Sequence, residues 1–160
     1  MTSVINKGAN AVEIEGDFDD CQQIVKDIFE DINFREEVNL SAVNSINWAR
    51  IIVQTVYYFY TYFLLKTDKP INFSVPTGNF GDVYAGYLSK KIGLPIDKLV
   101  VATNQNDILH RAITKGQYET KTVIETISPS MDIQIASNFE RLIYDLSNGC
   151  LLYTSPSPRD

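Results

Sequence analysis

Apolar residues recur with the period of a helix in two segments of the N-terminal half of the chain. From Asp17, which is suited to cap a first turn, apolar positions follow every three to four residues to about residue 30. Residues 44–66 are apolar on almost every side, which predicts a long helix buried inside a globular domain. Residues 11–15 alternate apolar and acidic side chains and predict a short strand, whereas residues 31–42 predict a loop.

Two strands, each followed by a helix, are predicted further along the chain. Residues 71–75 form an apolar run typical of a strand, and a helical pattern starts soon after it at residue 82 and ends before Gly93. Residues 98–103 predict a second strand, followed by a short helix that ends near Gly116. Because strands separated by helices favour parallel pairing, the pattern indicates an α/β fold with a parallel sheet.

The C-terminal part combines an irregular segment with one more helix. Residues 117–135 show no period, and a helix is predicted from Ser137, with Glu140 completing a capping box. The side chains that this helix is expected to bury are Phe139, Leu142, Ile143 and Leu146. Residues 150–160 turn to serine and proline and resemble a translated sequencing adapter, so we expect an artefactual, disordered tail there.

Composition narrows the classes of function. The 160 residues carry a formal net charge of −6, which disfavours nucleic acid or an anionic membrane surface as a partner. Two cysteines and one histidine do not suffice for a disulfide framework or a Cys/His zinc site, and they fit a reducing, cytoplasmic compartment. The apolar residues 51–65 are interrupted by Gln54, Thr55 and Thr61, which favours a buried helix over a membrane span.

A polar loop with two glycines joins the strand at 71–75 to the helix at 82. Ligands of parallel sheets bind beyond the carboxyl ends of the strands, where a helix N-terminus offers unpaired N–H groups. Glycines can bring their N–H groups close to an anion and adopt positive φ, and a carboxylate at the helix start can act as a cap. The expected phosphate-binding residues are Thr77, Gly78, Asn79, Phe80, Gly81 and Asp82. A merely structural turn stays open as the alternative, because the loop is neither a Walker A motif nor GxGxxG.

Four segments of the chain resemble threonine synthases of the fungal and proteobacterial type. They read VEIEGDFDDCQQIVKDIF, VNLSAVNSINWARI, FSVPTGNFGDVYAGYLSKKIGLPIDKLVVATNQNDIL and SPSMDIQIASNFERLIYDL. The resemblance covers residues 1–149 and implies the fold type II (tryptophan synthase β-like) superfamily of pyridoxal-5′-phosphate-dependent enzymes. Part of a three-layer αβα parallel sheet is then expected, in a catalytic domain truncated at both ends.

The resemblance implies a lyase of threonine biosynthesis that converts O-phospho-L-homoserine and water to L-threonine and phosphate. The family's loop that matches residues 77–82 binds the phosphate of pyridoxal 5′-phosphate. The lysine that forms the family's Schiff base lies in a Phe-Lys-Asp-like motif that does not occur here, so we expect this chain alone to be inactive. Two alternatives stay open: a threonine synthase-like phospho-lyase acting on a related phosphorylated amino acid, and a non-catalytic phosphate-binding module.

Other polar residues are further candidates. Those at the start of the helix at 44–66 could line the substrate side or merely cap the helix: Asn44, Ser45, Asn47 and Arg50. His110 and Arg111 are expected at the surface. Residues 130–132 lie in a loop that the resemblance places near the cofactor, and the aromatic residues 57–63 are expected in the core.

Overall fold

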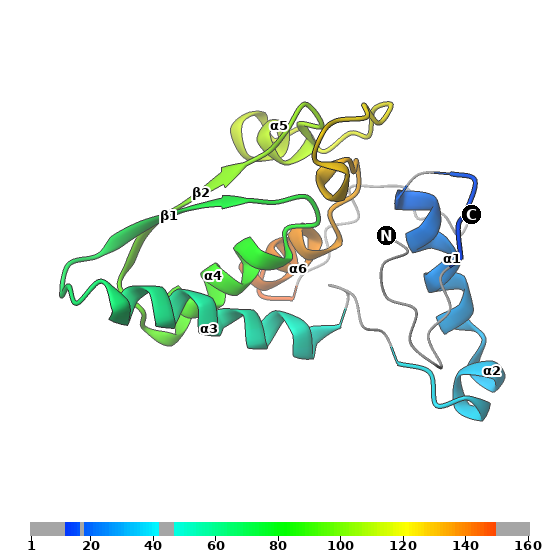
Figure 1. The fold of residues 1–160 in the computed structure, drawn as a ribbon, viewed down its shortest axis with the longest axis horizontal. Coiled ribbons are helices and arrows are strands. Elements are labelled where there is room, and N and C mark those ends of the chain that lie inside the picture. The colour runs from blue at the N-terminus through cyan, green and yellow to red at the C-terminus, as the bar shows by residue number, and fades with distance from the viewer. Residues whose placement is uncertain (1–11, 17, 42–46, 150–160) are drawn as a thin grey trace. The chain divides into compact units, whose positions relative to one another are not determined.

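The computed structural model describes residues 12–16, 18–41 and 47–149 (Figure 1). By its internal contacts the chain divides into two compact units, Met1–Leu40 and Ser41–Asp160. The expected tail at residues 150–160 lies outside the described residues.

The described part of the first unit contains two helices, α1 (Phe18–Glu30) and α2 (Ile32–Glu37). The first predicted helix is confirmed as α1, while its predicted cap Asp17 lies outside the described residues. The strand predicted at 11–15 is wrong where the structure describes it, because residues 12–15 form no strand. A segment with alternating apolar and polar side chains forms a strand only where a second strand is available for pairing. The described part of this unit contains no second strand.

Helix α2 occupies part of a segment that was expected to be a loop, residues 31–42. The Asp31 carboxylate accepts the Phe34 N–H at 3.0 Å, and this cap allows the chain to resume a helix directly after α1. None of the six residues of α2 is buried, so local capping rather than packing favours the helix. The loop prediction is therefore wrong over α2.

The second unit is a two-stranded parallel sheet with helices on both sides. Its elements are α3 (Trp48–Leu64), β1 (Ile71–Pro76), α4 (Gly81–Ile92), β2 (Ile96–Ala102), α5 (Ile108–Lys115), a 3-10 turn (Pro129–Met131) and α6 (Ser137–Leu146). In Figure 1 both strand arrows point the same way, with α3 and α4 below them and α5 above. The predicted α/β fold with a parallel sheet is confirmed, with two strands among the described residues.

The two strands pair along their whole length. The pairing runs from Ile71 opposite Ile96 to Pro76 opposite Ala102, with an irregularity between Ile71 and Phe73. Helix α4 connects the end of β1 to the start of β2, as parallel pairing requires. The carboxyl ends of both strands consequently lie at the same edge of the sheet, where the loops that follow them meet.

Helix α3 is buried along one face only. Its buried side chains, at helical spacing, are Ile51, Thr55, Tyr58 and Tyr62. Its exposed large apolar side chains are Trp48, Ile52, Val53, Val56, Tyr57, Tyr60, Phe63 and Leu64. The prediction that the aromatic residues 57–63 lie in the core is confirmed for Tyr58 and Tyr62 and wrong for Tyr57, Tyr60 and Phe63. The helix is not buried on its other side, because α4 packs along one face of α3. Among the described residues, no helix is long and apolar enough to cross a membrane.

The core of the second unit brings together β1, β2, α4 and the segments after β2. Its fully buried apolar members include Ala85 of α4, Ile108 and Leu109 of α5, and Ile133 and Ala136 before α6. Residues from the irregular segment after α5 thus pack into the same core as the helix that follows β1. This packing fixes the irregular segment beside the loop at 77–80.

Helix α6 begins at the predicted residue but not with the predicted cap. Ala136 is the N-cap residue and Ser137 is the first helical residue, whose N–H donates to Asn79 Oδ1 at 2.7 Å. The Ser137 hydroxyl oxygen is buried without a partner among the described residues, so the capping box with Glu140 is wrong. Of the four side chains expected to be buried, Phe139 is buried and Leu142 half-buried, whereas Ile143 and Leu146 are exposed.

Candidate anion-binding site at the start of α4

The loop that follows β1 lies at the carboxyl edge of the sheet. The Thr77 N–H donates to the Ala102 carbonyl at 3.0 Å, which extends the pairing of β1 with β2 by one step. The chain then turns through Gly78 and Asn79, and α4 starts at Gly81. The loop therefore occupies the place where ligands of parallel sheets bind.

Thr77 in the loop and Asp82 in the first turn of α4 hold the shape of the loop through hydrogen bonds. The Thr77 hydroxyl accepts the Phe80 N–H at 3.1 Å and donates to Asp82 Oδ1. The same carboxylate oxygen accepts the Val83 N–H at 2.9 Å, so Asp82 accepts a backbone N–H at the helix start as expected, although Phe80 is the N-cap residue. The hydroxyl proton of Thr77 is thus used inside the loop, so Thr77 supports the loop rather than offering a donor to a ligand.

Three main-chain N–H groups, in the loop and the first turn of α4, have no hydrogen-bond acceptor within the described structure. Among the described residues, the N–H groups of Gly78, Gly81 and Asp82 donate to no acceptor. The first N–H groups of a helix carry a partial positive charge and lack partners within the helix. This combination favours an anion at the start of α4.

A phenylalanine, and not a glycine, carries the unusual backbone conformation of the loop. Phe80 has φ of 64°, in the left-handed region, which costs roughly 1–2 kcal/mol for a residue with a Cβ. Its ring is buried and packs edge-on against Phe139, with centroids 5.2 Å apart, and this burial opposes the strain. The expectation that Gly78 and Gly81 adopt positive φ is wrong, because neither is among the described glycines that do.

Gly78 is needed for close packing instead. A Cβ at this position would lie 3.0 Å from both Met131 Cα and the Ser130 carbonyl oxygen, closer than ordinary contact allows. The structure thus places the backbone of residues 130–131, which the resemblance sets near the cofactor, directly against the loop.

A cavity of about 290 Å³ opens beside the loop, between α3 and β1. Its wall includes Pro76 and Asp82, which flank the loop, together with Gln54, Tyr57 and Tyr58 of α3. The Tyr58 hydroxyl donates to the Asp82 carbonyl at 2.6 Å, and burial, with the nearby Asp82 charge, raises the pKa of Tyr58. Gln54 Oε1 is buried without a partner among the described residues. Two of the aromatic residues expected in the core thus line a cavity.

The sequence contains one signal for this cavity. Gln54, Tyr58 and Thr61 interrupt an apolar helix at spacings of four and three residues. Such positions fall on one face of a helix. All three line the cavity.

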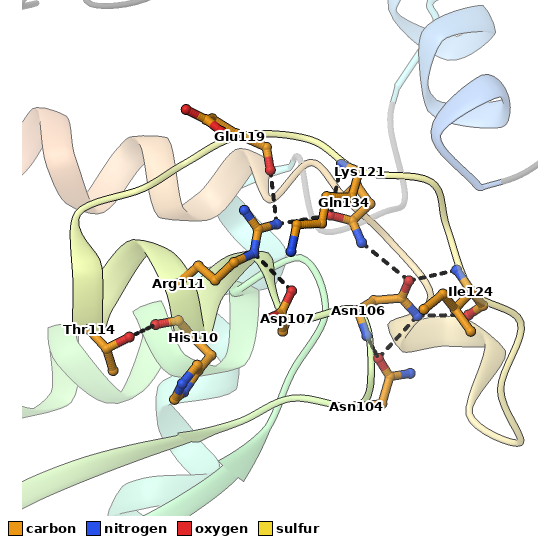
Figure 2. A network of polar contacts seen from close by, with 10 residues as sticks. All are labelled: Asn104, Asn106, Asp107, His110, Arg111, Thr114, Glu119, Lys121, Ile124 and Gln134. Atoms are coloured by element: carbon orange, nitrogen blue, oxygen red, sulfur yellow. Dashed lines mark hydrogen bonds and ion pairs between the residues drawn. The ribbon is translucent and has the colours of Figure 1, made fainter.

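Figure 2 shows two separate sets of hydrogen bonds around α5, one between His110 and Thr114 and one that includes Arg111. His110 is exposed, as expected, and its carbonyl accepts the Thr114 hydroxyl. Arg111 was expected at the surface but is buried, with 5% of its surface exposed. It donates to Asp107 Oδ1 and to the Glu119 carbonyl, both at 2.9 Å, and the bond from Arg111 lowers the pKa of Asp107.

The polar start of α3 has a structural role in its described part. Asn47 Oδ1 accepts the Ala49 N–H at 2.9 Å, so Asn47 caps α3. The other candidates Asn44 and Ser45 lie outside the described residues. Within the described ranges, no three histidine, cysteine or acidic side chains gather to hold a metal ion.

Comparison with known proteins identifies close relatives, although no protein-family model matches the chain. Threonine synthase from Pseudomonas aeruginosa is 52% identical over 147 residues, which are 91% of this chain and 31% of that protein. The enzyme from Saccharomyces cerevisiae is 52% identical over 151 residues, 92% of this chain and 29% of the relative. The crystal structure of PLP-bound threonine synthase from Brucella melitensis matches with a TM-score of 0.74 and 55% identity, over 84% of this chain and 29% of that one.

The relatives confirm the resemblance read from the sequence motifs. The chain spans about 30% of the length of the relatives it matches. Over that stretch, the identity and the shared parallel α/β fold make the chain a homologue of threonine synthases, which are fold type II pyridoxal-phosphate enzymes.

Proposed function

We propose that this chain carries the cofactor-phosphate site of an enzyme that converts O-phospho-L-homoserine and water to L-threonine and phosphate. The observation that carries the proposal is the set of three N–H groups, of Gly78, Gly81 and Asp82, that donate to no described acceptor at the start of α4. Homology to threonine synthases over nine tenths of the chain supports the assignment of the reaction.

The residues present fit the phosphate group of pyridoxal phosphate. A phosphate dianion needs several donors that converge without steric obstruction, and main-chain N–H groups at a helix start meet this need without any lysine. The net charge of −6 does not oppose such binding, because the donors act locally at the helix end. When bound, pyridoxal phosphate supplies an electron sink for chemistry at the substrate α-carbon.

The side chains around these donors have supporting roles. Thr77 and Asp82 hold the turn through their mutual hydrogen bond, and Tyr58 fixes the Asp82 carbonyl. The buried Phe80 ring anchors the loop to α6 through Phe139. These contacts place the donors before a ligand arrives, which lowers the entropy lost on binding.

No lysine of α4 is placed to act in covalent catalysis by this chain. Lys90 bonds to the Asp97 carbonyl, and Lys91 pairs with Asp145 at the far end of the helix. Because the family's Phe-Lys-Asp-like motif does not occur in this chain, we propose that the chain provides cofactor binding and that the reactive amine comes from elsewhere in the enzyme. The cysteine content supports a cytoplasmic location for that enzyme.

The test uses the protein encoded by the complete reading frame that contains this chain. Its affinity for pyridoxal 5′-phosphate is compared with its affinity for pyridoxal, which has the same ring without the phosphate. The expected result is much tighter binding of the phosphorylated form, with threonine and inorganic phosphate formed from O-phospho-L-homoserine. Phosphate release only from another phosphorylated amino acid would favour the phospho-lyase, and binding without turnover would favour the binding module. Equal affinity for the two ligands would refute the proposed site.

A further inference from the structure

A single carboxylate, Asp132, organises the irregular segment that packs against the loop. It is buried, with 8% of its surface exposed, and accepts four hydrogen bonds. Two come from the Thr126 N–H and hydroxyl, each at 2.7 Å. The others come from the side-chain amides of Asn104 at 2.6 Å and Asn106 at 3.1 Å.

These asparagines attach the segment to the end of β2. Asn104 and Asn106 follow β2 directly, at the same edge of the sheet as the loop after β1. Asn106 also bonds to both backbone groups of Ile124, at 2.8 and 2.9 Å, and accepts from Gln134 (Figure 2). The segment is therefore held at several points, with Asp132 near its contact with the loop.

The other end of the segment is bonded to the loop itself. The Ser137 N–H donates to Asn79 Oδ1 at 2.7 Å, and the Asn138 N–H donates to the Asn79 carbonyl at 3.4 Å. The backbone of Met131 lies against Gly78, within reach of any Cβ there. Two of the four residues between β1 and α4 thus take their position from residues 131–138.

We propose that Asp132 is a positioning residue for the phosphate loop, acting through residues 131–138 on Gly78 and Asn79. The inference rests on the proposed function, since it concerns the same phosphate group. No hydrogen bond of Asp132 reaches residues 77–82 within the described structure, so its action on the bound phosphate is indirect. We call the four hydrogen bonds of Asp132, with the contacts of residues 131–138 to the loop, the brace. Loss of the brace should weaken binding of pyridoxal 5′-phosphate and leave binding of pyridoxal, which lacks the phosphate, unchanged.

Asp132→Asn removes the brace with almost no change in size. The new NH₂ group replaces one of the two carboxylate oxygens and then faces a hydrogen-bond donor. At Oδ2 this donor is the Thr126 N–H, and at Oδ1 the donors are side chains that include the Thr126 hydroxyl. Asp145→Asn is the matched control, because Asp145 also accepts bonds from two side chains, Tyr87 and Lys91, but at the far end of α4. Both variants exchange one carboxylate for one amide.

A second pair of variants tests the hydrogen bond between residue 137 and Asn79, at the other end of the segment. Ser137 is the first residue of α6, where proline is tolerated because that N–H has no partner inside the helix. Ser137→Pro removes the N–H that reaches Asn79, whereas Ser137→Ala keeps it and removes only the unpartnered hydroxyl. This pair keeps the inference testable if Asp132→Asn fails to fold.

The measurement is the ratio of the affinities for pyridoxal 5′-phosphate and pyridoxal in the protein from the complete reading frame. We expect Asp132→Asn and Ser137→Pro to lower this ratio about tenfold, and Asp145→Asn and Ser137→Ala to leave it unchanged. A role in stability alone would lower the melting temperature without moving the ratio, and that result would overturn the inference. If the unmodified protein shows no preference for the phosphorylated ligand, the proposed function fails as well.

Discussion

Replacement of Gly78 by alanine tests the close contact on which the geometry of the loop depends. The new Cβ would lie 3.0 Å from Met131 Cα and from the Ser130 carbonyl oxygen, whereas ordinary contacts start at 3.4 Å. Both neighbours are backbone atoms of a segment that is bonded at several points, so a rotamer change cannot relieve the contact. One of the two segments has to move by a few tenths of an ångström.

The magnitude follows from this displacement. Overpacking of this kind costs about 1–3 kcal/mol, and each kcal/mol lowers the melting temperature of a domain of this size by roughly 2–4 °C. The shift also moves the Gly78 N–H away from its place. A hydrogen bond to a charged group contributes about 1.5–3 kcal/mol, so its loss weakens binding of pyridoxal 5′-phosphate by about tenfold or more.

A second glycine supplies the control for this experiment. Gly116 ends α5 with φ of +68°, and an added Cβ there would meet open space. Gly116→Ala therefore costs roughly 1–2 kcal/mol through backbone strain alone, at a position outside the loop. Thermal melts and ligand titrations of both variants separate stability from binding. If Gly78→Ala loses stability but keeps its affinity for the phosphorylated ligand, the reasoning about the loop is refuted.

Three further changes probe the same site. Thr77→Val leaves the buried Phe80 N–H without its acceptor, so we expect a loss of about 1–3 kcal/mol in unfolding free energy. Thr77→Ser keeps the hydroxyl and should stay close to the parent. Equal losses of unfolding free energy for the two variants in denaturant melts would contradict this expectation. Tyr58→Phe should cost about 1 kcal/mol near neutral pH. Because burial raises the pKa of Tyr58, stability should also fall above about pH 10 in the parent and less so in the variant, and parallel pH profiles would count against this. Burial opposes the charge of Asp132, but bonds from Thr126 and the asparagines outweigh it and lower the pKa of this carboxyl. The stabilising effect of the Asp132 carboxylate should therefore be present at neutral pH and fade as the pH falls below about 4. There the melting temperatures of the parent and of Asp132→Asn should converge. A difference in melting temperature that persists below about pH 4 would contradict this expectation.

The elements of the second unit could be predicted because local patterns and tertiary packing agree there. Strand β1 is an apolar run bounded by Pro70 and a glycine loop, and α4 ends at Gly93, whose φ of +116° suits glycine. The position of the loop followed from the order strand, loop, helix alone. The Asp82 carboxylate accepts a backbone N–H of the first turn of α4, as expected, because this bond joins residues adjacent in sequence.

The errors occurred where the outcome depends on residues far away in sequence. The Ser137 N–H bonds to Asn79, 58 residues earlier, and no local pattern reveals that this contact replaces a capping box. Arg111 looked like a surface residue because its partner Glu119 acts through a carbonyl, which carries no sequence signal. Positive φ was assigned to the glycines on propensity, whereas packing of the Phe80 ring on α6 decides the actual backbone conformation.

The central claim is that main-chain N–H groups at the start of α4 bind a phosphate group. Selective nitrogen-15 labelling of glycine in the protein from the complete reading frame tests it directly, because Gly78 and Gly81 can be compared with Gly93 and Gly116 in one spectrum. The account predicts that pyridoxal 5′-phosphate shifts the amide signals of Gly78 and Gly81, that pyridoxal does not, and that the signals of Gly93 and Gly116 stay in place. Saturating phosphorylated ligand with no shift at Gly78 or Gly81 would contradict the account.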